Sequence, residues 1–217
     1  MQQVAKYLLN KKRQSSLRTL LILSSLSLVG IVAFSGLNSQ QVKALEAESV
    51  MVERLSYSQV GSFPVENFQA YTSPFGYRRS PRGGSRMQFH QGLDIAAPEG
   101  SYIRNWWSGK VVKVSDNTAC GTAITIQSGD WKHVYCHMKG RAGTGSKGRY
   151  IIDRAGGIQI WEGQQIPSGA RIGRVGMTGR TTGPHLHWGV KYKNKYIDPA
   201  LVLRAMYSKQ ERLGIGG

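Results

Sequence analysis

Two histidines, His185 and His187, lie two residues apart in a short apolar segment that follows a loop rich in Gly and Thr. In an extended strand successive side chains point to opposite faces, so both imidazoles would lie on one face. Imidazole is a common zinc ligand and a common general base. This pair can therefore offer one ring to a metal ion and the other to a substrate. Two half-exposed strand histidines are the simpler interpretation of this spacing alone.

His90 and Asp94 form a second group that favours a metal site. They are four residues apart, with Gly92 between them, at the entry to a predicted strand. A turn at this place can bring both side chains to one point. Hydrolytic zinc sites use three protein ligands and leave a fourth position for water. His90, Asp94 and one histidine of the 185/187 pair would supply that set.

Residues 131–138 contribute two more histidines. In a strand, alternation puts His133, Tyr135 and His137 on one face and Cys136 on the other. We expect His137 to act beside the metal as a base or proton donor. His133 is expected to be a surface or flanking strand residue without a role in the chemistry.

The elements that must position these groups are mostly β-strands. Glycine is frequent from residue 69 onward and turn residues recur at short intervals, which is typical of an all-β, antiparallel, sandwich-like fold. The predicted strands cover residues 69–72, 92–95, 102–104, 109–115, 123–127, 132–138, 171–175 and 185–191. One helix is expected over 199–212, capped by Asp198 and opened by Pro199. Residues 140–157 are Gly-rich and unpatterned, which predicts a long surface loop.

Cys120 and Cys136 lie on either side of a predicted turn at residues 128–130. A hairpin folded at that turn brings them within about two residues of opposition, so a disulfide is expected in an oxidising compartment. Two buried free thiols are the alternative, because a shift of a few residues in the hairpin register would separate the two cysteines.

Residues 1–44 have the pattern of a signal peptide or N-terminal membrane anchor. A basic stretch ending at Arg18 precedes an uncharged run over 19–42, and Val42-Lys43-Ala44 fits a signal-peptidase site. The run is also long enough to cross a bilayer of about 30 Å, so a retained anchor stays open. Either way the remainder is expected outside the cytoplasm, in the periplasm, cell envelope or extracellular space. We divide it into a tether at 45–68, a catalytic domain at 69–204 and a tail at 205–217.

The charge balance narrows the class of partner. The 217 residues carry a net charge of +17, and removing the six basic residues of 1–44 leaves +11. A basic domain favours anionic partners such as a phospholipid surface or an acidic wall polymer. No helix with clustered Lys and Arg and no basic-aromatic signature is present in the sequence, so nucleic acid is not expected as a partner. We expect a monomer, with membrane contact only through the N-terminal segment.

Five motifs, in order along residues 71–199, resemble the lysostaphin/LytM-type zinc metalloendopeptidases, which cut peptide cross-links of bacterial peptidoglycan. They are TSPFGYR at 72–78, HQGLDIAAPEG at 90–100, YCHM at 135–138, GQQI at 163–166, and GMTG at 176–179 running into GPHLH at 183–187. Residues 102–107 and an apparent insertion at 141–157 depart from the family pattern. These departures leave the identity of the cleaved bond open.

The resemblance implies that His90, Asp94 and His187 hold Zn²⁺ and that His137 and His185 are catalytic. An imidazole can take a proton from water, stabilise a developing oxyanion or protonate the leaving amine. The implied protein is an exported zinc metalloendopeptidase acting on peptidoglycan cross-links. The alternatives are a non-catalytic envelope module that binds the wall or regulates other hydrolases, and a secreted polyanion-binding β-domain. Neither alternative accounts for all five placed residues.

Overall fold

The computed structural model describes residues 39–40, 61–80, 83, 85 and 87–214, and the elements discussed below belong to one unit, Leu55–Gly217. The predicted signal peptide or anchor at 1–44 lies outside the described residues apart from Ser39 and Gln40. No helix in the described ranges has both the length and the apolar character that a membrane span requires.

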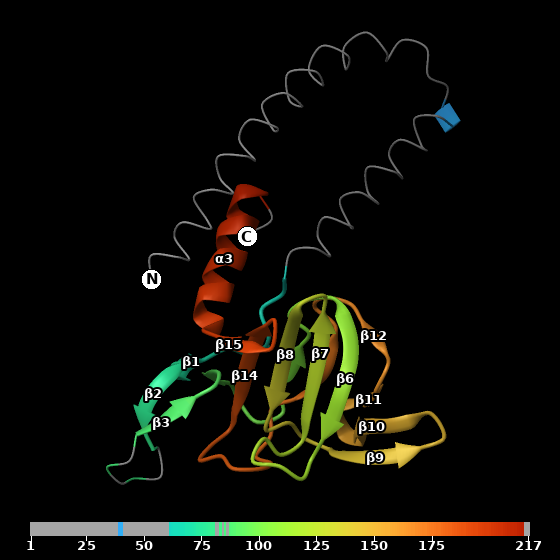
Figure 1. Cartoon of the computed structure of the whole chain (residues 1–217). Coiled ribbons are helices and arrows are strands. Elements are labelled where there is room, and N and C mark those ends of the chain that lie inside the picture. Colours follow the sequence, from blue (N-terminus) through green and yellow to red (C-terminus); the bar gives the residue numbers. More distant parts are fainter. Residues whose placement is uncertain (1–38, 41–60, 81–82, 84, 86, 215–217) are drawn as a thin grey trace. The chain divides into compact units, whose positions relative to one another are not determined.

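An antiparallel sheet of eight strands forms the centre of the fold (Figure 1). Its order is β1-β4-β14-β8-β7-β6-β12, and β15 pairs with β14. The strands are β1 Ala70–Ser73, β4 Leu93–Ala96, β6 Gly109–Ser115, β7 Ala123–Ser128, β8 Trp131–Cys136, β12 Gln165–Ile166, β14 His185–Tyr192 and β15 Lys195–Ile197. The predicted all-β antiparallel class is confirmed.

Smaller sheets and one long helix complete the domain. The remaining strands are β2 Gly76–Arg79 with β3 Met87–His90, β5 Tyr102–Arg104 with β13 Arg171–Arg174, and β9 Arg141–Gly145, β10 Gly148–Asp153 and β11 Ile158–Trp161. Helix α3 covers Pro199–Arg212, and the Asp198 side chain caps it by accepting from the Ala200 N–H at 2.9 Å. Leu203 and Met206 are buried, so the helix packs on the domain. It extends to Arg212, past the predicted domain end at residue 204.

The predicted surface loop at 140–157 is wrong. Strands β9 and β10 form a hairpin there, followed by the short 3₁₀ helix η2, Arg154–Gly156. The hairpin is held by tertiary contacts that composition did not reveal. Ile151 enters the core, and buried Asp153 pairs with the Arg174 guanidinium at 2.7 and 2.8 Å. A Gly-rich stretch can form regular strands when neighbouring elements supply the packing.

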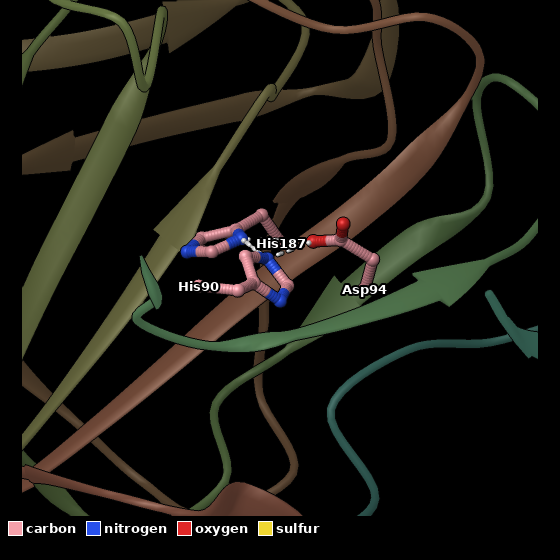
Figure 2. Close-up of side chains that lie close together, drawn as sticks. All are labelled: His90, Asp94 and His187. Atoms are coloured by element: carbon pink, nitrogen blue, oxygen red, sulfur yellow. Dashed lines mark hydrogen bonds and ion pairs between the residues drawn. The ribbon is translucent and has the colours of Figure 1, made fainter. Parts of the chain in front are cut away.

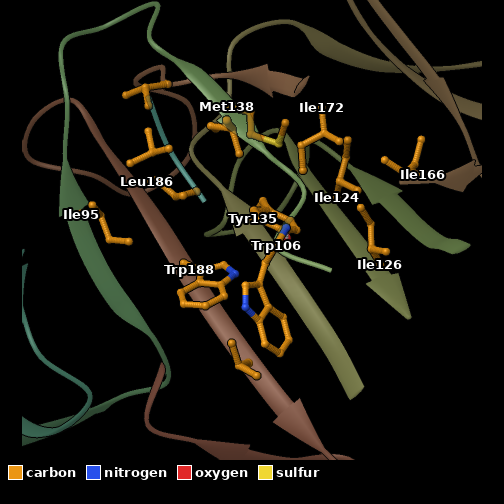
Figure 3. Packing of buried hydrophobic residues seen from close by; sticks show 14 of the residues in the cluster. Ile95, Trp106, Ile124, Ile126, Tyr135, Met138, Ile166, Ile172, Leu186 and Trp188 are labelled. Atoms are coloured by element: carbon orange, nitrogen blue, oxygen red, sulfur yellow. Dashed lines mark hydrogen bonds between the residues drawn. The ribbon is translucent and has the colours of Figure 1, made fainter. Parts of the chain in front are cut away.

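Strand β14 lies between β4 and β8 and separates the core from the candidate site. Leu186, Trp188 and Val190 are fully buried on one face, while His185 and His187 lie on the other. The alternation predicted for the two histidines is therefore confirmed. Figure 3 shows Leu186 and Trp188 among the core residues, with Trp106 close to Trp188 at a ring-centroid distance of 5.7 Å.

His133 is buried, so its prediction as a surface or flanking strand residue is wrong. Its Nε2 lies 2.9 Å from the Ser128 hydroxyl and its Nδ1 lies 3.0 Å from the Tyr135 hydroxyl. The Tyr135 hydroxyl also accepts from the backbone N–H of Trp106 at 2.8 Å, and the Ser128 hydroxyl donates to the Ser108 carbonyl at 2.7 Å. This chain of hydrogen bonds satisfies the buried imidazole in its neutral form. Burial lowers the pKa of His133 to about 3.

Residues 61–68, the described end of the predicted tether, are built into the domain. Ser62 donates to the Trp106 carbonyl at 2.7 Å, and Val65 is buried and bridges Ile103. Glu66 forms ion pairs with the guanidinium groups of Arg104 and Arg171. The described part of this stretch therefore contributes to the packing of the domain.

The structure joins Cys120 and Cys136 by a disulfide, with their Cα atoms 4.9 Å apart. Cys120 lies in the turn before β7, and Cys136 is the last residue of β8. The His137 N–H also donates to the Cys120 carbonyl at 2.8 Å. Covalent and hydrogen bonds therefore hold this turn against the end of β8.

We predict that His133 makes the fold less stable in acid. Below pH about 6.5 the unfolded chain protonates this histidine whereas the folded chain does not, so the free energy of unfolding falls with decreasing pH until about pH 3. The limiting slope is about 1.4 kcal/mol per pH unit. Urea unfolding at several pH values should show that slope as a difference between the wild type and His133→Gln, whose neutral amide can keep both hydrogen bonds. Parallel curves would contradict the prediction.

We also predict that oxidised protein has no titratable thiol when denatured without reductant and two after reduction. The bond links residues 16 apart, so reduction should lower the free energy of unfolding by about 3 kcal/mol. The Cys120→Ser/Cys136→Ser double variant is the control, and its stability should not respond to reductant. Two titratable thiols in unreduced exported protein would argue against the bond.

Candidate active site

His90, Asp94 and His187 converge on one point from three strands (Figure 2). The β4–β14 register places Asp94 directly opposite His187, and His90 ends β3. The Asp94 Oδ1 lies 2.8 Å from His187 Nδ1 and 3.1 Å from His90 Nε2, and the two ring nitrogens are 3.0 Å apart. One donor atom from each residue lies within 4.8 Å of the other two, so the three can hold one metal ion.

The other nitrogen of His90 fixes the orientation of the ring. His90 Nδ1 lies 2.8 Å from the Pro74 carbonyl oxygen, which only accepts, so Nδ1 carries the proton. The Nε2 lone pair then points toward Asp94 and His187. A ring held this way is typical of metal-binding histidines, whose second nitrogen donates to a carbonyl or carboxylate.

Gly92 leaves space for the His187 ring. A Cβ atom at this position would lie 2.7 Å from His187 Cε1 and Nε2 and 2.7 Å from the Trp188 carbonyl oxygen. A larger residue would therefore displace the imidazole or the β14 backbone. The glycine between His90 and Asp94 permits the close approach that brings the three donor atoms together.

Three imidazole rings surround Asp94: His187 Nδ1, His90 Nε2 and His185 Nε2 lie 2.8, 3.1 and 3.5 Å from its Oδ1. Burial alone would raise its pKa, but the interactions with His185, His187 and His90 outweigh burial and hold the pKa below its ordinary value. The carboxylate therefore stays ionised at neutral pH, as a metal ligand must.

His185 faces the same cavity from β14. Its Nε2 lies 3.5 Å from Asp94 Oδ1, and its Nδ1 lies 2.8 Å from the Gly183 carbonyl oxygen. Burial acts to lower the pKa of His185, but the hydrogen bond with Asp94 raises it to a net value above the ordinary one. The backbone carbonyl holds one nitrogen and leaves the other facing the site.

His137 reaches the cavity because the chain turns sharply after β8. Strict alternation would place it on the core face with Tyr135, and that detail of the prediction is wrong. A left-handed φ of +60° at His137 redirects the side chain. Its Nδ1 lies 2.9 Å from the Thr178 carbonyl oxygen, and its ring centroid is 4.9 Å from that of His185. Burial lowers the pKa of His137 to about 4. Backbone conformations of this kind are concentrated at functional sites.

These five side chains line an open cavity of about 430 Å³. The β2–β3 hairpin forms one wall, with Arg78, Gln88 and Phe89. The loop at 176–184 and the turn at 119–120 form the other, with Arg180 and Cys120. The arrangement offers a three-donor metal site and two adjacent imidazoles in one open cavity.

The groups that orient the histidines were not predicted from the sequence. They are the carbonyls of Pro74, Thr178 and Gly183, and their effect depends on folded backbone geometry. Arg78, whose Nη2 lies 3.7 Å from an oxygen of Asp94, was not predicted either. All four residues lie within the quoted motifs, and that position was the available signal.

The chain is similar to curated proteins that are named as peptidases. It is 31% identical over 138 residues to the peptidoglycan DD-endopeptidase ShyB of Vibrio cholerae, covering 63% of this chain and 28% of ShyB. It is 29% identical over 145 residues to the DD-carboxypeptidase/endopeptidase Mpg of Neisseria meningitidis, covering 65% of this chain and 29% of Mpg. The matched part thus spans less than a third of each relative.

Among solved structures, a zinc-containing peptidase from Vibrio cholerae superimposes with a TM-score of 0.51 at 29% identity, over 64% of this chain and 39% of that one. The profile of peptidase family M23 matches residues 88–199, which is more than half of the chain and includes the five histidine and aspartate positions of the cavity. Together with the motif order and the fold, this match shows that the chain belongs to peptidase family M23.

Proposed function

We propose that this protein is an exported zinc metalloendopeptidase that hydrolyses peptide cross-links of bacterial peptidoglycan. The convergence of His90, Asp94 and His187 beside His137 and His185 in one open cavity is the observation that carries the proposal. The name of the relative ShyB, a peptidoglycan DD-endopeptidase, supports peptidoglycan peptides as the substrate class.

Zinc fits the donor set. Two imidazole nitrogens and one carboxylate oxygen are a ligand combination of hydrolytic zinc sites. The carbonyl bound by His90 and the space left by Gly92 both favour that geometry. When bound there, zinc supplies a Lewis acid and lowers the pKa of a coordinated water toward neutrality.

His137 and His185 are assigned to proton transfer. Each has its Nδ1 within hydrogen-bonding distance of a backbone carbonyl oxygen, so the Nε2 atom is left to exchange a proton with water or the leaving amine. The depressed pKa of His137 keeps that ring neutral at pH 7. Two imidazoles side by side can also stabilise negative charge that develops on the scissile carbonyl oxygen.

Export is supported by two features. Residues 1–44 have the sequence pattern of a signal peptide or membrane anchor. The Cys120–Cys136 disulfide suits an oxidising compartment such as the periplasm or cell exterior. The net positive charge would concentrate the protein at an anionic envelope, an effect that salt weakens.

The decisive experiment combines zinc content with digestion of cross-linked peptidoglycan. We expect about one zinc per chain, release of new amino groups from the peptidoglycan, and loss of that release after chelation with recovery on adding zinc. Stoichiometric zinc without cleavage of several cross-link chemistries would favour the non-catalytic module instead.

Substitution of the two β14 histidines should separate binding from turnover. His187→Ala should lose both zinc and activity, because a ligand is removed. His185→Ala should keep zinc while turnover falls by about 10²–10⁴-fold, because a proton-transfer group is removed. His133→Gln, which alters a histidine outside the cavity, is the matched control and should keep both. Loss of zinc from His185→Ala would reverse the assignment of the pair.

A further inference from the structure

The charged groups on the cavity walls are unbalanced in sign. Among the described residues that line the cavity, Arg78 and Arg180 carry positive charge and Asp94 is the one acid. Asp94 is engaged by the surrounding histidines, as described above. Two guanidinium groups therefore face the groove without an acid of the protein dedicated to them.

Arg180 is presented by a fixed turn. Its backbone N–H donates to the Ala119 carbonyl at 2.8 Å, and Gly179 and Gly121 approach so closely that a Cβ on Gly179 would lie 2.3 Å from the Gly121 nitrogen. Gly179 has a φ of +73°, which suits glycine. The Arg180 side chain is exposed and its guanidinium contacts no acid or hydrogen-bond acceptor in the described part of the chain.

Arg78 occupies the opposite wall and is also incompletely used. Its closest acidic contact is Asp94 Oδ2 at 3.7 Å, longer than the 2.7–2.9 Å of a charge-assisted hydrogen bond. Its buried Nε has no acceptor among the described residues. A buried donor without an acceptor is unfavourable, so the described part of the protein does not satisfy all of the Arg78 guanidinium.

We propose that this cavity selects peptides that carry a free carboxylate close to the bond to be cleaved, with Arg180 and Arg78 as the residues that recognise it. This inference rests on the proposed function. The planar guanidinium matches a carboxylate through two parallel N–H···O bonds, and a carboxamide offers neither the charge nor the second acceptor. Amidation of the peptide would therefore act as a block to cleavage.

The test uses two synthetic cross-linked peptides that differ only in a carboxylate or carboxamide beside the scissile bond. The zinc-loaded wild type should show kcat/KM at least about tenfold higher for the free acid, as expected for a hydrogen bond between charged groups. Arg180→Gln should bring the acid-to-amide ratio close to one, and Arg180→Lys should restore part of it. Arg154→Gln, which removes the same charge from an exposed position outside the cavity lining, should keep the wild-type ratio.

Arg78→Gln is compared at equal zinc occupancy, because Arg78 also lies near Asp94. A lower acid-to-amide ratio in the fully zinc-loaded variant supports a role of Arg78 in carboxylate recognition. An unchanged ratio with weaker zinc binding would show that Arg78 only supports Asp94, and would overturn its role in recognition. Equal kcat/KM for both peptides in the wild type would overturn the inference and leave the peptidase proposal standing. Cleavage of neither peptide by zinc-loaded protein would contradict both.

Discussion

The antiparallel pairing of β4 with β14 is the constraint on which the candidate site depends. This register sets Asp94 opposite His187 and at the same time turns Leu186 and Trp188 into the core. A slip of one residue would move both histidines of β14 into the core and expose the apolar side chains. The burial of Leu186, Trp188 and Val190 therefore fixes the positions of the β14 histidines in the candidate site as well as stabilising the fold.

Around that pairing, the backbone carries out most of the fine positioning. Carbonyl oxygens orient His90, His137 and His185 through their Nδ1 atoms. Gly92 allows the His187 ring to approach, and the left-handed φ of His137 turns its ring away from the core. Apart from Gly92, these positions act through the backbone and require no particular side chain, so they leave little trace in the amino-acid composition.

What could be predicted from the sequence depends on whether nearby residues or the folded backbone determine a feature. Local rules were sufficient for the β14 alternation, for helix α3 with its Asp198 cap, and for the strand-rich fold class. Residue spacing suggested His90, Asp94 and one histidine of the 185/187 pair as zinc ligands. Motif resemblance chose His187 and assigned His137 and His185 to catalysis, and the convergence of the five side chains required the fold. Local rules failed at His133 and at the β9–β10 hairpin. There, partners distant in the sequence decide which polar groups are buried: Trp106 packs against His133, and the Arg174 guanidinium pairs with Asp153.

The disulfide has a consequence for when the cavity takes its final shape. Cys120 and Cys136 both line it, Cys136 pairs with His187 across the β8–β14 ladder, and the Cys120 turn holds the loop that carries Arg180. A reduced chain has one fewer link between the turn at 119–120 and the end of β8. With export as proposed, oxidation follows translocation, so this covalent link at the edge of the cavity would form only after the chain has left the cytoplasm.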